Sequence, residues 1–147
     1  MSAINPVQRT YVGPAFADAR VYDAMHVGVV TCGPDTPIAD AARMMTGYGI
    51  HCLIVAEIDA GGRSHHRGVI DALEVAAAAS DAQARTVGEI ATTEPLTIES
   101  NARLEDAARL MAEHRATHLV AVQPGSDSPV GVISASGLMA VLAWGRS

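Results

Sequence analysis

Histidine and cysteine are the residue types that first suggest chemistry in this chain, because imidazole and thiolate are common metal ligands. The sequence has six histidines and two cysteines, with His51 directly before Cys52 and a pair at His65-His66. No pair has metal-ligand spacing on one helix face. His65-His66 falls in a predicted loop, and His118, four residues after His114, is expected to begin a strand. We therefore expect no metal site, and a metal-responsive protein is kept only as an alternative.

Motifs for nucleophilic or nucleotide-cleaving chemistry do not occur. The sequence has no Gly-x-Ser-x-Gly, no phosphate-binding P-loop and no Gly-x-Gly-x-x-Gly fingerprint. We therefore expect a protein that is not an enzyme and requires no cofactor. Ten basic residues against sixteen acidic ones give a formal net charge of −6 without a basic cluster, so nucleic acid is not an expected partner.

Length and composition favour a globular protein. A chain of 147 residues, 49% of them hydrophobic, suits one ordinary domain or two small repeats sharing a core. The first twenty residues lack the pattern of a signal peptide, and the apolar runs are too short to span a bilayer. Cys32 and Cys52 show no disulfide-framework spacing. We expect a cytoplasmic protein without a membrane partner.

An internal repeat organises the chain. The segment 39–45, Ala-Asp-Ala-Ala-Arg-Met-Met, reappears at 105–111 as Glu-Asp-Ala-Ala-Arg-Leu-Met, 66 residues later. The same offset aligns Leu53-Ile54 with Leu119-Val120, and an offset of 63 then aligns residues 68–70 with 131–133. The loop Asp59 to Arg67 is expected to absorb the three extra residues of the first copy.

Each copy is predicted to fold as strand, helix, strand, strand, helix. Apolar residues at i, i+3, i+4 and i+7 predict a helix from Ile38 to Met45 and another from Leu104 to Met111. The start signals are residues 35–37 and 100–101, whose types cap helices. The other predicted elements are strands at 29–31, 52–56, 68–70, 96–98, 119–122 and 131–133, and helices at 72–79 and 136–143.

This order predicts an α/β (α+β) fold of two β-α-β-β-α repeats packed around a pseudo-twofold axis. We place an N-terminal extension at residues 1–20, the first repeat at 21–83 and the second at 84–147.

The two-copy pattern resembles the tandem CBS (cystathionine-β-synthase) domain pair, or Bateman module, over Val21 to Ala143. The resemblance is carried by the Asp-Ala-Ala-Arg-x-Met helix of each copy, by the strand His118–Val122, and by a Gly-Val-Ile-Ser strand at 131–134 that runs into a helix. It implies a regulatory or sensor module that is not a catalyst. It also implies dimerisation and an adenosine-type ligand in the inter-repeat cleft: AMP, ATP, adenosine or S-adenosylmethionine.

In the family that this chain resembles, the last strand of each copy typically ends with Ser or Thr, and an Asp follows three residues later. The hydroxyl and the helix N-terminus suit a phosphate, and the Asp suits a ribose. Here the second copy has Ser134 and Ser136 but Gly137 at the acid position. The first copy has Asp71 in place of the hydroxyl and Glu74 at the acid position. Because Asp71 would repel a phosphate, a nucleoside, a cationic ligand or an empty site is expected there.

Family sites combine elements of both copies, which adds four candidate ligand-binding residues: Thr31, His51, Thr97 and His118.

Every candidate also has a purely structural interpretation. Asp71 and Ser134 precede helices and can serve as N-caps, Glu74 can be a solvated helix residue, and the two threonines can be ordinary strand residues. The alternative to a ligand sensor is therefore a dimeric protein-interaction module whose ligand pocket has lapsed.

A homodimer is expected from the second helix of each copy as well as from the resemblance. These helices contain the apolar runs 76–79 and 138–144, which are poorly suited to water. The extension contains Tyr11, Val12 and Phe16, and it either packs as an arm on the dimer or frays.

Overall fold

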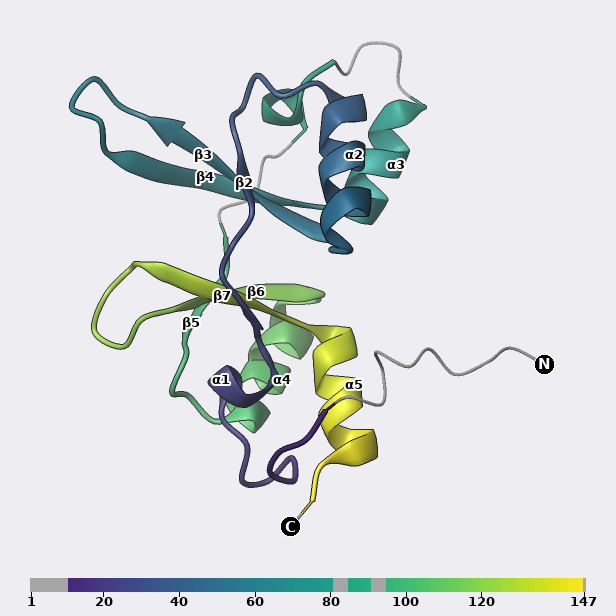
Figure 1. Ribbon diagram of the computed structural model, residues 1–147, viewed down its shortest axis with the longest axis vertical. Helices are drawn as coiled ribbons and strands as arrows, with labels where there is room; N and C mark the ends of the chain where they lie inside the picture. Colours follow the sequence, from purple (N-terminus) through teal and green to yellow (C-terminus); the bar gives the residue numbers. More distant parts are fainter. Residues whose placement is uncertain (1–10, 81–84, 91–94, 147) are drawn as a thin grey trace. The chain divides into compact units, whose positions relative to one another are not determined.

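The computed structural model describes residues 11–80, 85–90 and 95–146. The chain divides into two compact units. We call Val30–Pro95 the central unit, and the chain up to Val29 together with that from Leu96 onward the terminal unit. Both combine a β-sheet with α-helices (Figure 1).

The central unit has a sheet of strand order β2-β3-β4, with β2 (Thr31–Cys32) parallel and β4 (Ser64–Asp71) antiparallel to β3 (Cys52–Ile58). Helices α2 (Ile38–Tyr48) and α3 (Ala72–Ala79) supply Met45 and Val75 to a core shared with Leu53 and Ile70. A 3-10 helix, η2 (Val87–Glu89), adds Val87 to that core.

The terminal unit repeats this plan with one more strand. Its sheet has the order β1-β7-β6-β5, formed by β1 (His26–Val27), β7 (Pro129–Ser134), β6 (His118–Val122) and β5 (Thr97–Glu99). Helices α1 (Val21–Ala24), α4 (Leu104–His114) and α5 (Ala135–Trp144) complete it. Its core includes Leu104, Leu119, Ile133 and Leu138.

The mixed α/β fold and both strand-helix-strand-strand-helix copies are confirmed. The units nevertheless cross the sequence repeat. Segment 21–29 of the first copy belongs to the terminal unit, and segment 85–90 of the second copy belongs to the central unit. The repeat boundaries at 21–83 and 84–147 and the pseudo-twofold axis stay predictions.

The predicted loop at Asp59 to Arg67 is wrong in its second half. Strand β4 begins at Ser64, so His65 lies in a strand and pairs with Glu57, and His66 pairs with Ala56. The turn is held by Asp59, whose Oδ1 accepts hydrogen bonds from the Gly61 and Arg63 N–H groups. These bonds close the chain tightly enough for β3 and β4 to stay paired up to Ile58 and Ser64.

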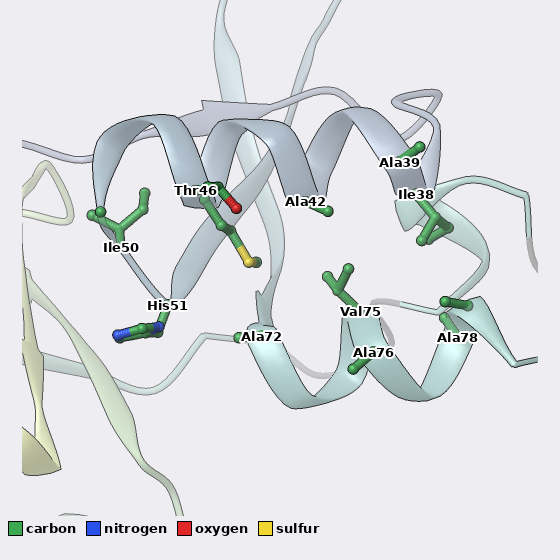
Figure 2. A pocket seen from close by; sticks show the side chains of 13 residues that line it. Ile38, Ala39, Ala42, Thr46, Ile50, His51, Ala72, Val75, Ala76 and Ala78 are labelled. Carbon is green, nitrogen blue, oxygen red and sulfur yellow. The ribbon is translucent and has the colours of Figure 1, made fainter.

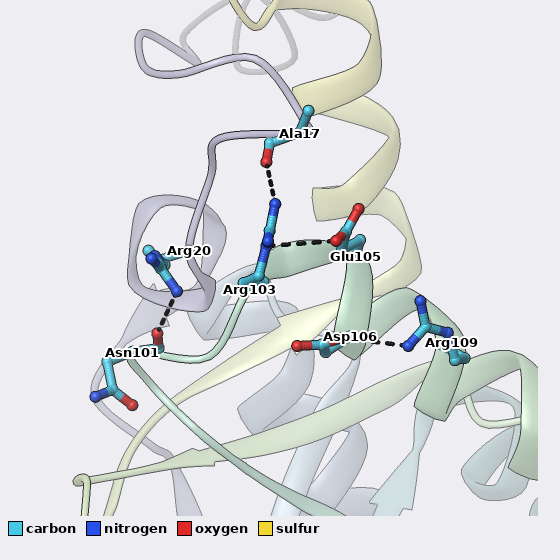
Figure 3. A network of polar contacts seen from close by, with 7 residues as sticks. All are labelled: Ala17, Arg20, Asn101, Arg103, Glu105, Asp106 and Arg109. Atoms are coloured by element: carbon cyan, nitrogen blue, oxygen red, sulfur yellow. Dashed lines mark hydrogen bonds and ion pairs between the residues drawn. The ribbon is translucent and has the colours of Figure 1, made fainter.

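The predicted start of α2 after residues 35–37 is confirmed, whereas the start signal predicted at 100–101 is wrong, because the N-cap residue of α4 is Arg103. Helix α2 has Pro37 at its N-cap and α4 has Arg103, and neither side chain makes a capping hydrogen bond. Arg103 instead donates to the Ala17 carbonyl and pairs with Glu105, so it ties the N-terminal segment to α4 (Figure 3).

Residues 11–20 of the extension are part of the terminal unit. Tyr11 and Phe16 lie against its core, and the Ala15 N–H donates to the Arg146 carbonyl. Val12 is exposed. Residues 1–10 lie outside the described residues, and an arm on a dimer stays a prediction.

Candidate functional site

The strand registers place most of the candidate residues on one face of each sheet. In the central unit Thr31 pairs with Ile54, and Asp71 pairs with Cys52 two residues earlier on β3. Their neighbours Cys32, Leu53 and Ile70 belong to the core beneath the helices. Because side chains alternate along a strand, Thr31 and Asp71 lie on the opposite, helix-free face.

The terminal unit has the equivalent arrangement. Thr97 pairs with Val120, and His118 pairs with Ser134. Leu119 is a core residue of this unit, so its strand neighbours His118 and Val120 point to the helix-free face. A threonine on the edge strand and a polar residue at the end of the last strand thus recur in both units.

Asp71 and Glu74 form a reciprocal pair at the start of α3. The Glu74 N–H donates to Asp71 Oδ1 at 2.8 Å, and the Asp71 N–H donates to Glu74 Oε1 at 3.2 Å. This capping box explains why the helix begins at Ala72. Two carboxylates here favour hydrogen-bond donors and cations and disfavour a phosphate.

The environment of this pair changes the acidity of its members and of a neighbour. Burial raises the pKa of the Glu74 carboxyl; the hydrogen bond from the Asp71 N–H opposes this, and the charge of Asp71 adds to it. Burial, with the charges of Asp71 and Glu74, raises the pKa of the Cys52 thiol to about 12. Cys52 is therefore a neutral thiol at physiological pH, which makes it a poor nucleophile and metal ligand.

In the terminal unit the hydroxyl residue Ser134 takes the place of Asp71, and Gly137 takes the place of Glu74. Ser134 Oγ accepts a hydrogen bond from the Gly137 N–H at 3.1 Å and lies 2.9 Å from Ser136 Oγ. No acidic residue occurs in the first turn of α5. His118, across the strand pair from Ser134, has its Nδ1 2.9 Å from Thr117 Oγ1. The Ser134 end of the terminal unit can therefore accept an anionic group, which Asp71 would repel in the central unit.

His51 is separated from the other candidates of its unit. It lines a cavity of about 910 Å³ between α2 and α3, together with apolar residues such as Ala42, Val75 and Ala76 (Figure 2). We call this cavity the groove. The offset of 66 equates His118 with Cys52, not with His51. The sequence repeat alone thus indicates that His51 and His118 are not equivalent positions. The role of His51 as a ligand-binding residue stays a prediction.

Residues 11–80, 85–90 and 95–146 lack two kinds of feature. They contain no group of three or more His, Cys, Asp or Glu side chains that could hold a metal ion. Among them there is also no helix with the length and apolar character needed to cross a membrane.

Matches to this sequence include one family model and two relatives. The model of the CBS domain matches residues 21–81 and 87–143. The CBS domain-containing protein YhcV of Bacillus subtilis is 31% identical over 117 residues, which are 79% of this chain and 80% of YhcV. The meiotically up-regulated gene 70 protein of Schizosaccharomyces pombe is 29% identical over 92 residues, which are 60% of this chain but only 12% of that protein.

Solved structures share the fold. The CBS domain pair of protein MJ0100, in complex with 5'-methylthioadenosine and S-adenosyl-L-methionine, matches with a TM-score of 0.73 and 19% identity, covering 85% of this chain and 96% of that one. The protein CBSX2 in complex with AMP matches with a TM-score of 0.61 and 25% identity, covering 82% and 93%. With both repeats matched and the fold shared, this chain belongs to the CBS domain family.

Proposed function

We propose that this protein is a stand-alone regulatory CBS pair, without enzymatic activity, that senses an adenosine-type ligand. The observation that carries the proposal is the polar arrangement repeated in both units, with a threonine on the edge strand and a capping residue at the end of the last strand. Two relatives of this fold hold adenosine compounds: S-adenosylmethionine with methylthioadenosine in one, and AMP in the other.

The two units should prefer different ligand chemistry. The Asp71–Glu74 pair favours the sulfonium cation of S-adenosylmethionine, or an uncharged nucleoside, over a phosphate. The hydroxyls of Ser134 and Ser136 carry no charge that would exclude an anion. The proposed site residues are Thr31, Asp71, Thr97, His118 and Ser134 on the two helix-free faces, together with Glu74 and Ser136 in the first turns of α3 and α5.

A thermal-shift panel tests this proposal. The full chain is heated with S-adenosylmethionine, methylthioadenosine, adenosine, AMP or ATP at millimolar concentration. A ligand bound only by the folded state at 100 times its Kd adds about 2.7 kcal/mol of stability, which raises the Tm by several degrees. We expect the largest shift with S-adenosylmethionine. The absence of a shift with all five compounds would contradict the proposal.

The Asp71→Asn variant is the matched control for charge. The amide oxygen can still accept the Glu74 N–H, so α3 keeps its cap while the carboxylate is removed. The difference in shift between S-adenosylmethionine and AMP should narrow in this variant. If the difference is unchanged, the Asp71 charge does not select the ligand.

We further propose that the protein works as a homodimer in the cytoplasm. Met139, Leu142 and Trp144 are exposed apolar side chains on one helix, α5, and a partner surface would remove them from water. Sedimentation equilibrium at micromolar concentration tests this, and a monomer would contradict it.

A dimeric interaction module with a lapsed pocket is the second candidate function. It is favoured by the reciprocal bonding of Asp71 and Glu74, which uses one carboxylate oxygen of each side chain to cap α3, and by Gly137 at the position where family members typically have the acid. Native mass spectrometry separates the two functions: a sensor retains an added adenosine compound, and a lapsed pocket retains none.

A further inference from the structure

Each member of the Asp71–Glu74 pair keeps one carboxylate oxygen outside the capping box. Asp71 Oδ1 accepts the Glu74 N–H at 2.8 Å, and Glu74 Oε1 accepts the Asp71 N–H at 3.2 Å. Within residues 11–80, 85–90 and 95–146, Asp71 Oδ2 and Glu74 Oε2 have no hydrogen-bond partner. These two oxygens are therefore available to a ligand or to a proton.

A proton on Glu74 Oε2 would leave the cap of α3 intact. Oε1 would then be the carbonyl oxygen of a carboxylic acid, which still accepts the Asp71 N–H. Asp71 Oδ1 would still accept the Glu74 N–H. Helix α3 can thus begin at Ala72 in both protonation states, and the proton changes only the charge of the pair.

Glu74 is the member of the pair whose surroundings favour a proton. Burial raises the pKa of its carboxyl most, the hydrogen bond from the Asp71 N–H opposes this, and the charge of Asp71 adds to it. Cys52 of the adjacent strand β3 has its pKa raised to about 12, so its thiol is neutral when the carboxyl titrates. On the side of α2, the lining of the groove contains no Asp, Glu, Lys or Arg, and its titratable residue is His51. Asp71 is therefore the charge that acts on Glu74 within the described part of the central unit.

The equivalent positions of the terminal unit carry no acid. Ser134 and Gly137 stand where the first copy has Asp71 and Glu74, and the first turn of α5 has no acidic residue. A pair of carboxyl groups that can share a proton at the helix start is thus a feature of the first copy alone.

We propose that the Asp71–Glu74 pair is a pH gate: a proton on the pair competes with a cationic ligand for the same negative charge, so that acidification releases the ligand. The inference rests on the proposed function, in which this pair binds the sulfonium cation of S-adenosylmethionine, and it adds the regulation of that site. Because the coupling is reciprocal, the bound cation must weaken proton binding by the same factor by which the proton weakens cation binding.

Isothermal titration calorimetry of the full chain with S-adenosylmethionine, between about pH 7 and about pH 5, tests the gate. The Kd should rise as the pH falls, by up to about tenfold per pH unit, because binding displaces a single proton. Titrations at the acid end in two buffers of different ionisation enthalpy should show that a proton is released when S-adenosylmethionine binds. Far-ultraviolet circular dichroism at the same pH checks that the chain stays folded.

Three variants assign the proton. Glu74→Gln keeps an oxygen that can accept the Asp71 N–H but takes up no proton, so its Kd should not depend on pH and its binding should release no proton. Asp71→Asn removes the charge that acts on Glu74, so its Kd should begin to rise at a lower pH than that of the wild type. Glu113→Gln, which removes an exposed carboxylate from α4, is the matched control and should follow the wild type.

The outcomes separate this inference from the proposed function. Binding of S-adenosylmethionine with a constant Kd and no proton release overturns the gate while the sensor stands. A pH dependence that persists in Glu74→Gln assigns the proton to another group, such as His51, and also overturns the gate. The absence of binding at every pH removes the gate together with the proposed recognition of S-adenosylmethionine.

Discussion

Removing the Asp71 side chain should destabilise the protein by about 1 kcal/mol, the typical loss for an Asp N-cap replaced by Ala. Asp71→Ala deletes the acceptor of the 2.8 Å bond from the Glu74 N–H and leaves that donor unsatisfied at the first turn of α3. One opposing effect is present, because the negative charge of Asp71 repels the neighbouring Glu74 carboxylate, as the raised pKa of Glu74 reflects. The removal of this repulsion keeps the loss near or slightly below 1 kcal/mol.

The assay is urea unfolding followed by circular dichroism, with the fluorescence of Trp144, the single tryptophan, as a second signal. In a chain of this size a loss of about 1 kcal/mol lowers the Tm by roughly 3 °C. Asp71→Asn keeps an acceptor oxygen and should stay within a few tenths of a kcal/mol of the wild type. A fully stable Asp71→Ala variant, or an Asp71→Asn variant that loses as much as Asp71→Ala, would refute the capping explanation.

Four further predictions each concern one residue. A Cβ at Gly131 would collide with the His26 carbonyl and separate β1 from β7. Gly131→Ala should therefore lower the free energy of unfolding in urea by about 2 kcal/mol. An unchanged unfolding midpoint would contradict the pairing of β1 with β7. Cys52 should resist thiol reagents at pH 8 until the chain unfolds, and rapid labelling of the native protein would contradict its burial. The pKa of Glu74 is raised in the folded state, so protonation of Glu74 stabilises the fold fully below the ordinary glutamate pKa, and this stabilisation is lost as the pH rises through the folded pKa. Glu74→Gln should therefore flatten the pH dependence of the unfolding free energy in this range. An unchanged pH dependence would contradict the raised pKa. Arg115 ends α4 with a left-handed backbone, φ 51°, where the first copy has Gly49, so Arg115→Gly should stabilise the chain by about 0.5–1 kcal/mol, and a loss of stability would show that the arginine side chain matters more than its backbone.

The elements whose formation depends on local pattern could be predicted from the sequence. The stripe Ile38 to Met45 and its copy Leu104 to Met111 form helices because their apolar side chains recur with the helical period. The alternative interpretation of Asp71 and Ser134 as N-caps is confirmed, because they accept hydrogen bonds from the Glu74 and Gly137 N–H groups, respectively. In each case the information lies within a few neighbouring residues.

Features that depend on distant contacts could not be predicted in this way. Strand β1 has only two residues, and it exists because His26 and Val27 pair with Val132 and Gly131, more than a hundred residues away. The exchange of segments 21–29 and 85–90 between the units likewise leaves no periodic signal. Among the site candidates, His51 lines the groove between α2 and α3. It directly precedes Cys52, the first residue of β3, and a shift of one position along an extended chain moves a side chain to the other face of the sheet.

Isothermal titration calorimetry of the full chain with S-adenosylmethionine and, separately, with AMP and ATP tests the proposed ligand preference most directly. The Asp71–Glu74 pair predicts saturable binding of S-adenosylmethionine with a lower Kd than either phosphate compound. The absence of binding by all three, or the tightest binding by ATP, would contradict it.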